Sequence, residues 1–111
     1  HLMNLTVTEK NLKIIVTGKN LKITDAIKNY LIEKITQTED SLYKNTSIHF
    51  NLFVDKNRHM AEAIIKQKGL TTRAKDQTRN LYLTLDNVLE KVEKQLRKHK
   101  SRVHTLLIKK S

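Results

Sequence analysis

The stretch SIHFNLFV, residues 47–54, decides the fold because its side chains alternate with a period of two. Ile48, Phe50 and Leu52 fall on one side, and Ser47 and Asn51 fall on the other. This period predicts a β-strand with one buried face. Since such a strand needs an apolar cover on one side only, the pattern favours a sheet with helices packed on one face.

The segments around this strand supply the other elements. Thr24 is a good N-cap for a helix that we expect to continue to about Tyr43, and Gly69 separates two further strands. The predicted strands are residues 13–17, 47–54, 59–68 and 70–75, and the predicted helices are residues 24–43 and 80–102. The order is β-α-β-β-β-α, an α+β fold with a four-stranded sheet. A right-handed crossover would make the first two strands parallel if they are neighbours.

The length of 111 residues favours one domain. We expect this domain at residues 13–102, between an N-terminal extension (residues 1–12, with His1 and Leu2 set aside) and a short basic tail (residues 103–111). With no Cys, the chain has no disulfide framework and no thiol nucleophile. No apolar stretch indicates a signal peptide or a membrane span, so we expect a cytoplasmic protein.

Positive charge is concentrated in the second half of the chain. Residues 1–55 hold seven Lys or Arg against six acids, whereas residues 56–111 hold fifteen against five. Like charges repel in a compact state, so this excess suggests a polyanionic partner. With only 5% aromatic residues, contact with a phosphate backbone is favoured over base stacking. An anionic membrane surface is the competing partner.

The predicted last helix separates its charges by face. One face is apolar, and a second mixes Asp86, Glu90 and Glu93 with cations. A third face carries no acid, and its residues are Asn87, Lys91, Lys94, Lys98 and Arg102. The alternative interpretation is a solubility face whose basic end suits the helix dipole. However, the dipole favours cations only in the last turn, and Lys91 lies about three turns earlier.

Two other basic groups are candidates for the same surface. One flanks Gly69 and consists of Lys66, Lys68, Arg73 and Lys75; the other surrounds the entry to the first helix and consists of Lys19, Lys22 and Lys28. Each group alone could equally be ordinary surface.

The sequence offers no catalytic candidate. The five His residues are dispersed, and His99 and His104 miss the i,i+4 spacing of a helical metal site. There is no nucleophile-elbow or phosphate-loop motif. We therefore expect no enzyme, metal, cofactor or small-molecule substrate. Tyr82 is interpreted as a core or hinge contact.

Three stretches in order resemble a known family. They are IVTGKN (residues 15–20) followed by ITDAI (23–27) and Tyr30, then LYLTLD (81–86) and VLEKVEKQLRKHK (88–100). They are similar to the ribosome hibernation-promoting factor and ribosome-associated inhibitor family (sigma-54 modulation proteins), in its short form without a C-terminal dimerisation domain.

The resemblance implies a domain shaped like double-stranded-RNA-binding domains. It also implies binding to the small ribosomal subunit and its rRNA, between head and body, where the family blocks mRNA and tRNA under stress or in stationary phase. Lys91, Lys94, Lys98 and Arg102 match the family's cationic helix, and Lys28 matches a basic position in its first helix. A separate dimerisation factor would be a further partner. The alternatives are a general double-stranded-RNA-binding module and, less favoured, a membrane-surface module.

Overall fold

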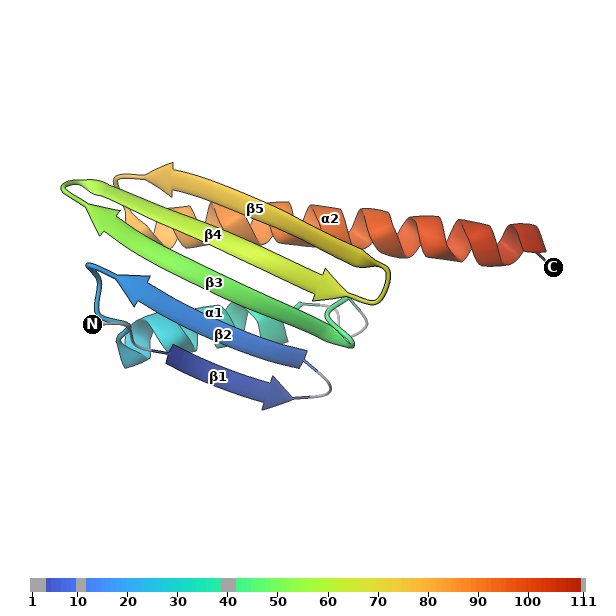
Figure 1. Cartoon of the computed structure of the whole chain (residues 1–111), viewed down its shortest axis with the longest axis horizontal. Coiled ribbons are helices and arrows are strands. Elements are labelled where there is room, and N and C mark those ends of the chain that lie inside the picture. Colours follow the sequence, from blue (N-terminus) through green and yellow to red (C-terminus); the bar gives the residue numbers. More distant parts are fainter. Residues whose placement is uncertain (1–3, 10–11, 39–41, 111) are drawn as a thin grey trace.

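The computed structural model describes the backbone of residues 4–9, 12–38 and 42–110, and the side chains of residues 12–38 and 42–101. Its elements are β1 (Asn4–Glu9), β2 (Leu12–Lys19), α1 (Asp25–Thr36), β3 (Thr46–Asp55), β4 (Arg58–Gln67), β5 (Leu70–Thr78) and α2 (Leu81–Lys110). The strands form one layer, and both helices lie on the same face of it (Figure 1).

The sheet has five strands in the order β1-β2-β3-β4-β5. The predicted β-α-β-β-β-α arrangement is confirmed, and β2 and β3 are parallel neighbours. The other neighbouring strands pair antiparallel. The fifth strand, β1, comes from the segment that the sequence pattern assigned to an extension. It pairs with β2, with Leu5 opposite Val16.

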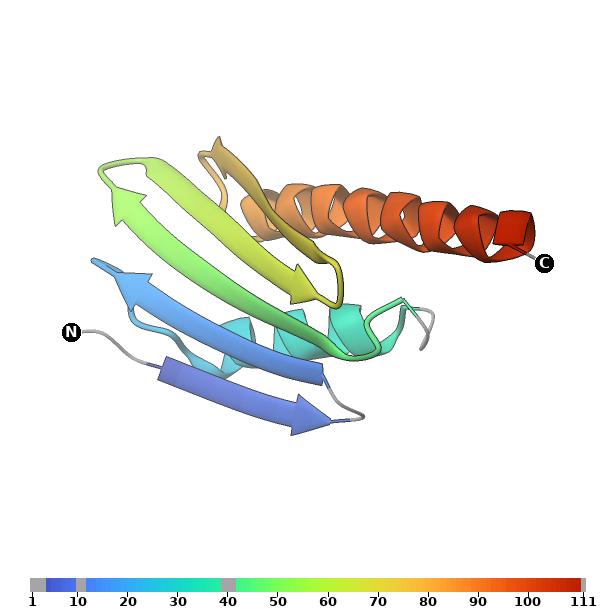
Figure 2. The same ribbon diagram turned by 45° about the vertical axis from the view of Figure 1, so that its right-hand side comes forward.

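The core lies between the sheet and the two helices (Figure 2). Ile48, Phe50 and Leu52 are at most 1% exposed, so the alternation that predicted β3 reports a real buried face. The helices cover it with buried side chains, namely Ile27, Leu31 and Ile35 of α1 and Leu85, Val88, Leu89, Val92 and Leu96 of α2. The apolar face expected for the last helix is thus used in folding.

α1 begins as expected, because the Thr24 hydroxyl accepts a hydrogen bond from the Ile27 amide at 3.3 Å. It ends at Thr36, earlier than the predicted Tyr43. The hydroxyls of Thr36 and Thr38 donate to backbone carbonyls of the last turn, at 3.2 and 2.9 Å, and so provide partners for a helix end. Tyr43 is buried beyond the helix, so the apolar spacing there reflects a packed connection.

α2 begins after Asn80, whose side-chain oxygen accepts from the Leu83 amide at 3.1 Å. The helix continues to Lys110, through the segment expected to be a tail. It therefore extends past the end of the sheet (Figure 1).

Gly18 is required by a close approach at the end of β2. A Cβ placed there would lie 2.5 Å from the Leu21 carbonyl oxygen and 2.8 Å from Cδ1 of Ile23. Since the nearer atom belongs to the backbone, the connection to α1 would have to shift to make room.

We expect Gly18→Ala to lower the free energy of unfolding by about 1–3 kcal/mol, the usual cost of overpacking. Urea denaturation measures this change. Ser47→Ala, at a partly exposed strand position, is the control and should change the value by less than about 0.5 kcal/mol. Equal denaturation midpoints for the two variants would show that the close approach at position 18 does not require glycine.

Candidate nucleic-acid interface

A polar seam joins α2 to the edge strand β5. Its residues are spaced by four along the helix, and they are Asn87, Lys91, Gln95 and His99. The Lys91 ammonium donates to the Lys75 carbonyl at 2.8 Å, and the Gln95 amide donates to the Arg73 carbonyl at 3.1 Å. β5 has a strand neighbour on one side only, so its other side presents polar groups that need partners. The seam supplies some of those partners.

The seam continues at both ends. The Asn87 amide donates to the Asp76 carboxylate at 2.8 Å, and His99 Nε2 lies 3.1 Å from the Lys68 carbonyl oxygen. Gln95 also accepts from the Thr72 hydroxyl. The position of α2 along β5 is therefore fixed over three turns.

Lys91 differs from its expected role as a free cation. Its ammonium lies 3.4 Å from the Asp76 carboxylate as well as on the Lys75 carbonyl. The helical period showed a face without acids, but the acid comes from β5. Part of the charge of Lys91 is thus used to hold the structure together.

The other cations of that helical face differ in whether they have an acidic partner. Lys94 pairs with Glu90 at 3.5 Å. Lys98 is exposed, and it makes no ion pair with any side chain that the structure describes. The side chain of Arg102 lies outside the described residues, so its expected role is not tested.

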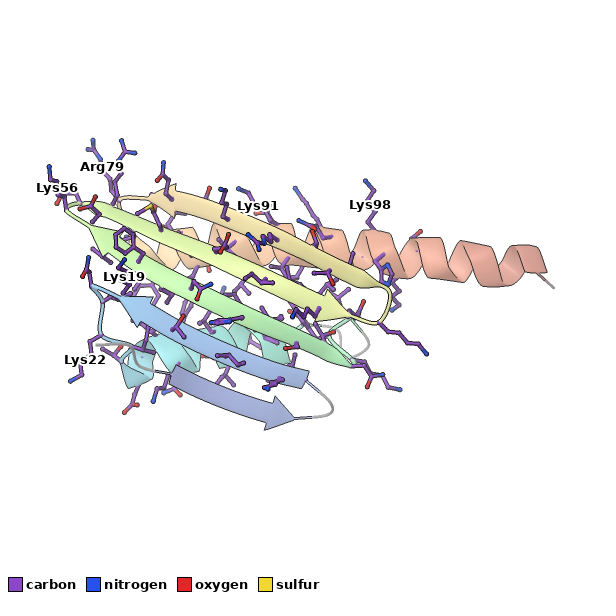
Figure 3. All side chains as sticks on the ribbon, in the orientation of Figure 1. Lys19, Lys22, Lys56, Arg79, Lys91 and Lys98 are labelled. Atoms are coloured by element: carbon purple, nitrogen blue, oxygen red, sulfur yellow. The ribbon has the colours of Figure 1, made fainter. Side chains whose placement is uncertain are left out.

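The seam brings the predicted hairpin cations to the same edge. Lys68 lies beside His99, and Lys75 lies beside Lys91, through the backbone contacts above. The exposed cations along this edge, which we call the edge stripe, are Lys68, Arg73, Lys75, Lys91 and Lys98. Of these, Arg73 lies 3.8 Å from the Glu62 carboxylate, so it is paired with an acid as Lys91 is. Figure 3 shows Lys91 and Lys98 extending from the same side of α2. Two groups that are separate in sequence thus meet at one edge, with Arg73 and Lys75 on the open side of the sheet and Lys91 and Lys98 on α2.

Two predicted residues, Lys22 and Lys28, lie apart from the edge stripe. Lys22 precedes α1, on the far side of the molecule from Lys98 (Figure 3). Lys28 lies on α1, 3.9 Å from Asp25. Lys66 borders the stripe, because it faces the open side of the sheet together with Arg73 and Lys75.

A groove of about 320 Å³ separates α1 from α2 and carries both signs of charge. Its lining residues are Lys34, Asp86, Leu89, Glu90, Glu93, Lys94 and Arg97. Arg97 and Glu93 are paired at 3.4 Å, and Lys34 lies 4.0 Å from Asp86. This balance makes the groove a poorer site for a polyanion than the edge stripe.

Asp86 links the helices at one end of this groove. The Tyr30 hydroxyl donates to its carboxylate, and this hydrogen bond, with burial and the nearby negative charge, raises the pKa of Tyr30 to about 12. Tyr82 packs edge-on against Tyr30, with ring centroids 4.8 Å apart. Tyr82 is 39% exposed, so it is a surface contact between helices and not a core residue.

Four further exposed cations gather at one end of the sheet. They are Lys19, Lys56, Arg58 and Arg79. Lys56 lies in the turn between β3 and β4, Arg58 begins β4, and Arg79 lies between β5 and α2. No helical or strand period therefore relates these three residues. The sequence pattern therefore does not group them.

Within the described ranges, no three His, Cys, Asp or Glu side chains are placed to hold a metal ion. None of the helices, over the residues described, is long and apolar enough to cross a membrane.

The fold and sequence together define the class. Residues 14–104 match the family described as "Sigma 54 modulation protein / S30EA ribosomal protein", and the chain belongs to this family. The match covers most of the chain, from within β2 to within α2.

Individual relatives agree with this assignment. The chain is 27% identical over 84 residues to the ribosome hibernation promoting factor of Pseudomonas putida, covering 76% of this chain and 82% of that one. It is 32% identical over 85 residues to the ribosome hibernation promotion factor of Lactococcus lactis, of which it spans 45%, with 73% of this chain covered. A ribosomal subunit interface protein from Coxiella burnetii has a similar structure, with a TM-score of 0.72, 26% identity, and coverage of 79% of this chain and 97% of that one.

The structural role of Lys91 can be separated from that of Lys98. We expect Lys91→Met to lower the free energy of unfolding by about 0.5–1 kcal/mol, because the Lys75 carbonyl and Asp76 lose a donor at a partly exposed site. Lys98→Met removes the same charge without a contact and should leave stability within about 0.5 kcal/mol. Chemical denaturation of both variants measures the difference. Equal free energies of unfolding for the two variants would show that the contacts of Lys91 in the seam do not stabilise the fold.

The pKa of Tyr30 provides a test of the Asp86 contact. Replacing Asp86 with Asn should bring the pKa of Tyr30 down from about 12 toward its ordinary value of 10.0, because the negative acceptor is removed. In the wild type, Tyr30 loses its proton near pH 10 in the unfolded state but only near pH 12 in the folded state. The contribution of the Tyr30–Asp86 contact to the free energy of unfolding is therefore present below pH 10 and is lost between about pH 10 and 12.

NMR titration with ¹³C-labelled tyrosine resolves Tyr30 from the other two tyrosines. Glu90→Gln, in the same groove but without a contact to Tyr30, is the control. An unchanged Tyr30 titration in Asp86→Asn would rule out the contact.

Proposed function

We propose that this protein is a non-catalytic ribosome hibernation factor that binds the small ribosomal subunit through rRNA. It occupies the decoding region between head and body, blocks mRNA and tRNA, and so inhibits translation in the cytoplasm under stress or in stationary phase. The observation that carries the proposal is the edge stripe, an exposed cationic edge fixed in place by the polar seam. The family and the names of the relatives support it.

The chemistry of the edge stripe suits a phosphate backbone. Its side chains are Lys and Arg at the surface, which form charge-assisted hydrogen bonds with phosphate oxygens. Contacts of this kind position a protein on a nucleic acid without reading its sequence. A folded RNA of fixed shape, such as rRNA, is a partner that such an edge can recognise by the placement of its phosphates.

Inhibition then follows from occupancy. A rigid domain whose extents are 54 × 25 × 21 Å is large enough to exclude another ligand from the space that it fills. This mechanism needs neither a reacting group nor a cofactor. The relatives' names point to the ribosome, and the position between head and body rests on the family resemblance.

A general double-stranded-RNA-binding module is the alternative. A short RNA duplex added in excess distinguishes the two functions. A ribosome-specific factor should remain on small subunits, whereas a general duplex binder should be displaced.

Cations of the edge stripe should matter more than cations that face the groove. In Lys68→Gln/Lys98→Gln, we expect affinity for isolated small subunits to fall roughly 25- to 60-fold at 0.1 M salt, because two phosphate contacts are lost. The slope of log affinity against log salt should become shallower by roughly 1.4–1.8. Co-sedimentation over a range of salt concentrations measures both quantities.

The matched control is Lys94→Gln/Arg97→Gln, which removes the same charge from the side of α2 that faces the groove. It should change affinity much less, since both side chains are already paired with acids. Equal losses of affinity in the two variants would show that the edge stripe contributes only general electrostatic attraction. Failure of the wild type to bind small subunits would overturn the proposed function itself.

A further inference from the structure

Lys19, Lys56, Arg58 and Arg79, which we call the end cluster, come from four places in the chain. Lys19 ends β2, Lys56 lies in the β3–β4 turn, Arg58 begins β4, and Arg79 lies between β5 and α2. Figure 3 shows Lys19, Lys56 and Arg79 at the same end of the sheet. This end is away from the hairpin that carries Lys68, so the cluster extends the cationic surface of the molecule.

Strand register places two of these residues next to each other. His59 pairs with Thr78 across β4 and β5, so Arg58 and Arg79 occupy the following positions on neighbouring strands. Neighbouring strands lie about 5 Å apart. At that spacing, the two guanidinium groups can reach a single phosphate group.

Hydrogen bonds hold the junction in this arrangement. The Thr78 hydroxyl lies 2.7 Å from the Thr84 hydroxyl, which also lies 3.2 Å from the His59 carbonyl oxygen. The Asn80 amide donates to the Thr78 hydroxyl at 3.0 Å. The start of α2 is thus tied to the start of β4, and Arg58 and Arg79 project from a rigid frame.

The charge of the end cluster is not neutralised by the described part of the chain. All four side chains are exposed, and the ion pairs found among the described residues involve none of them. Lys19 lies over the ring of Phe53, 5.7 Å from its centroid. Asp55 pairs in strand register with Arg58, so one acid faces four cations, and the first turn of α2 has no acid. The cluster therefore keeps a net positive charge.

Lys56 also occupies a backbone conformation that lysine rarely adopts. Its φ is +55°, in the left-handed region where glycine fits without strain. A glycine would suit the turn better, so the fold alone does not explain the lysine. An observed strain of this kind points to a role outside folding.

We infer that the end cluster is a second phosphate-contact site for RNA, separate from the edge stripe. This inference rests on the proposed function and deepens it. The bound RNA would contact the protein at the β5–α2 edge and at the end of the sheet. Two contacts on different sides of one rigid domain would fix its orientation, whereas one row of cations could slide along a backbone.

The variant Lys56→Gly/Arg79→Gln tests the site without loss of folding. We expect its affinity for isolated small subunits at 0.1 M salt to fall roughly 25- to 60-fold, with a slope of log affinity against log salt shallower by roughly 1.4–1.8. Lys56→Gly alone should keep or raise the denaturation midpoint, because glycine relieves the left-handed strain. A stable variant that binds less tightly separates binding from folding.

The matched control is Lys13→Gln/Lys44→Gln, which removes two exposed charges at the opposite end of the parallel pair β2 and β3. Its affinity should fall less than threefold. Equal affinities of Lys56→Gly/Arg79→Gln and the wild type would overturn the inference while leaving the proposed function intact. Absence of binding by the wild type would instead overturn the proposed function.

A crosslink identifies the partner at this end. Because the chain has no Cys, Asn57→Cys introduces a single thiol in the β3–β4 turn for a photoreactive label, and Lys44→Cys is the control position. On small subunits, label at position 57 should crosslink to rRNA, and label at position 44 should do so much less. Crosslinking of position 57 to ribosomal protein alone would contradict a phosphate site.

Discussion

The contact between α2 and the edge of β5 is the constraint on which the rest of the structure depends. An edge strand leaves backbone groups without strand partners and invites pairing with another chain. Here the side chains of Lys91 and Gln95 reach the carbonyls of Lys75 and Arg73. At the same time, the apolar face of the helix packs on the sheet. The same helix thus completes the core and covers an exposed edge.

This contact also determines where the positive charge can act. It brings Lys68 and Lys75 beside the helix that carries Lys98, although the two segments are separated in sequence. Two other cations of α2, Lys94 and Arg97, line the groove, where they already have acidic partners. Exposed pairs of this kind contribute only about 0–1 kcal/mol each, so they affect the distribution of charge more than the stability of the fold.

Much of the fold could be predicted because it follows from short-range patterns. The alternation in β3, the Thr24 cap and the apolar face of α2 each depend on residues close together in sequence. The early end of α1 was missed because Leu42 and Tyr43 continue the apolar spacing after the helix stops. β1 was missed because its place in the sheet depends on its pairing with β2, which the local sequence does not show.

The site was harder to predict because its grouping is tertiary. A helical projection placed Lys91 on a face without acids, but Asp76 reaches it from β5. Lys98 and Lys68 were both candidates, yet only the seam shows that they share an edge. Arg58 and Arg79 become neighbours through strand register, which no local pattern reveals.

On the proposed function, the edge stripe meets rRNA on the small subunit. Cryo-electron microscopy of the protein bound to isolated small ribosomal subunits would show this contact. We expect density between head and body, with Lys68, Arg73, Lys75 and Lys98 against rRNA phosphates. Density that leaves this edge in solvent, or places it against ribosomal protein alone, would contradict it.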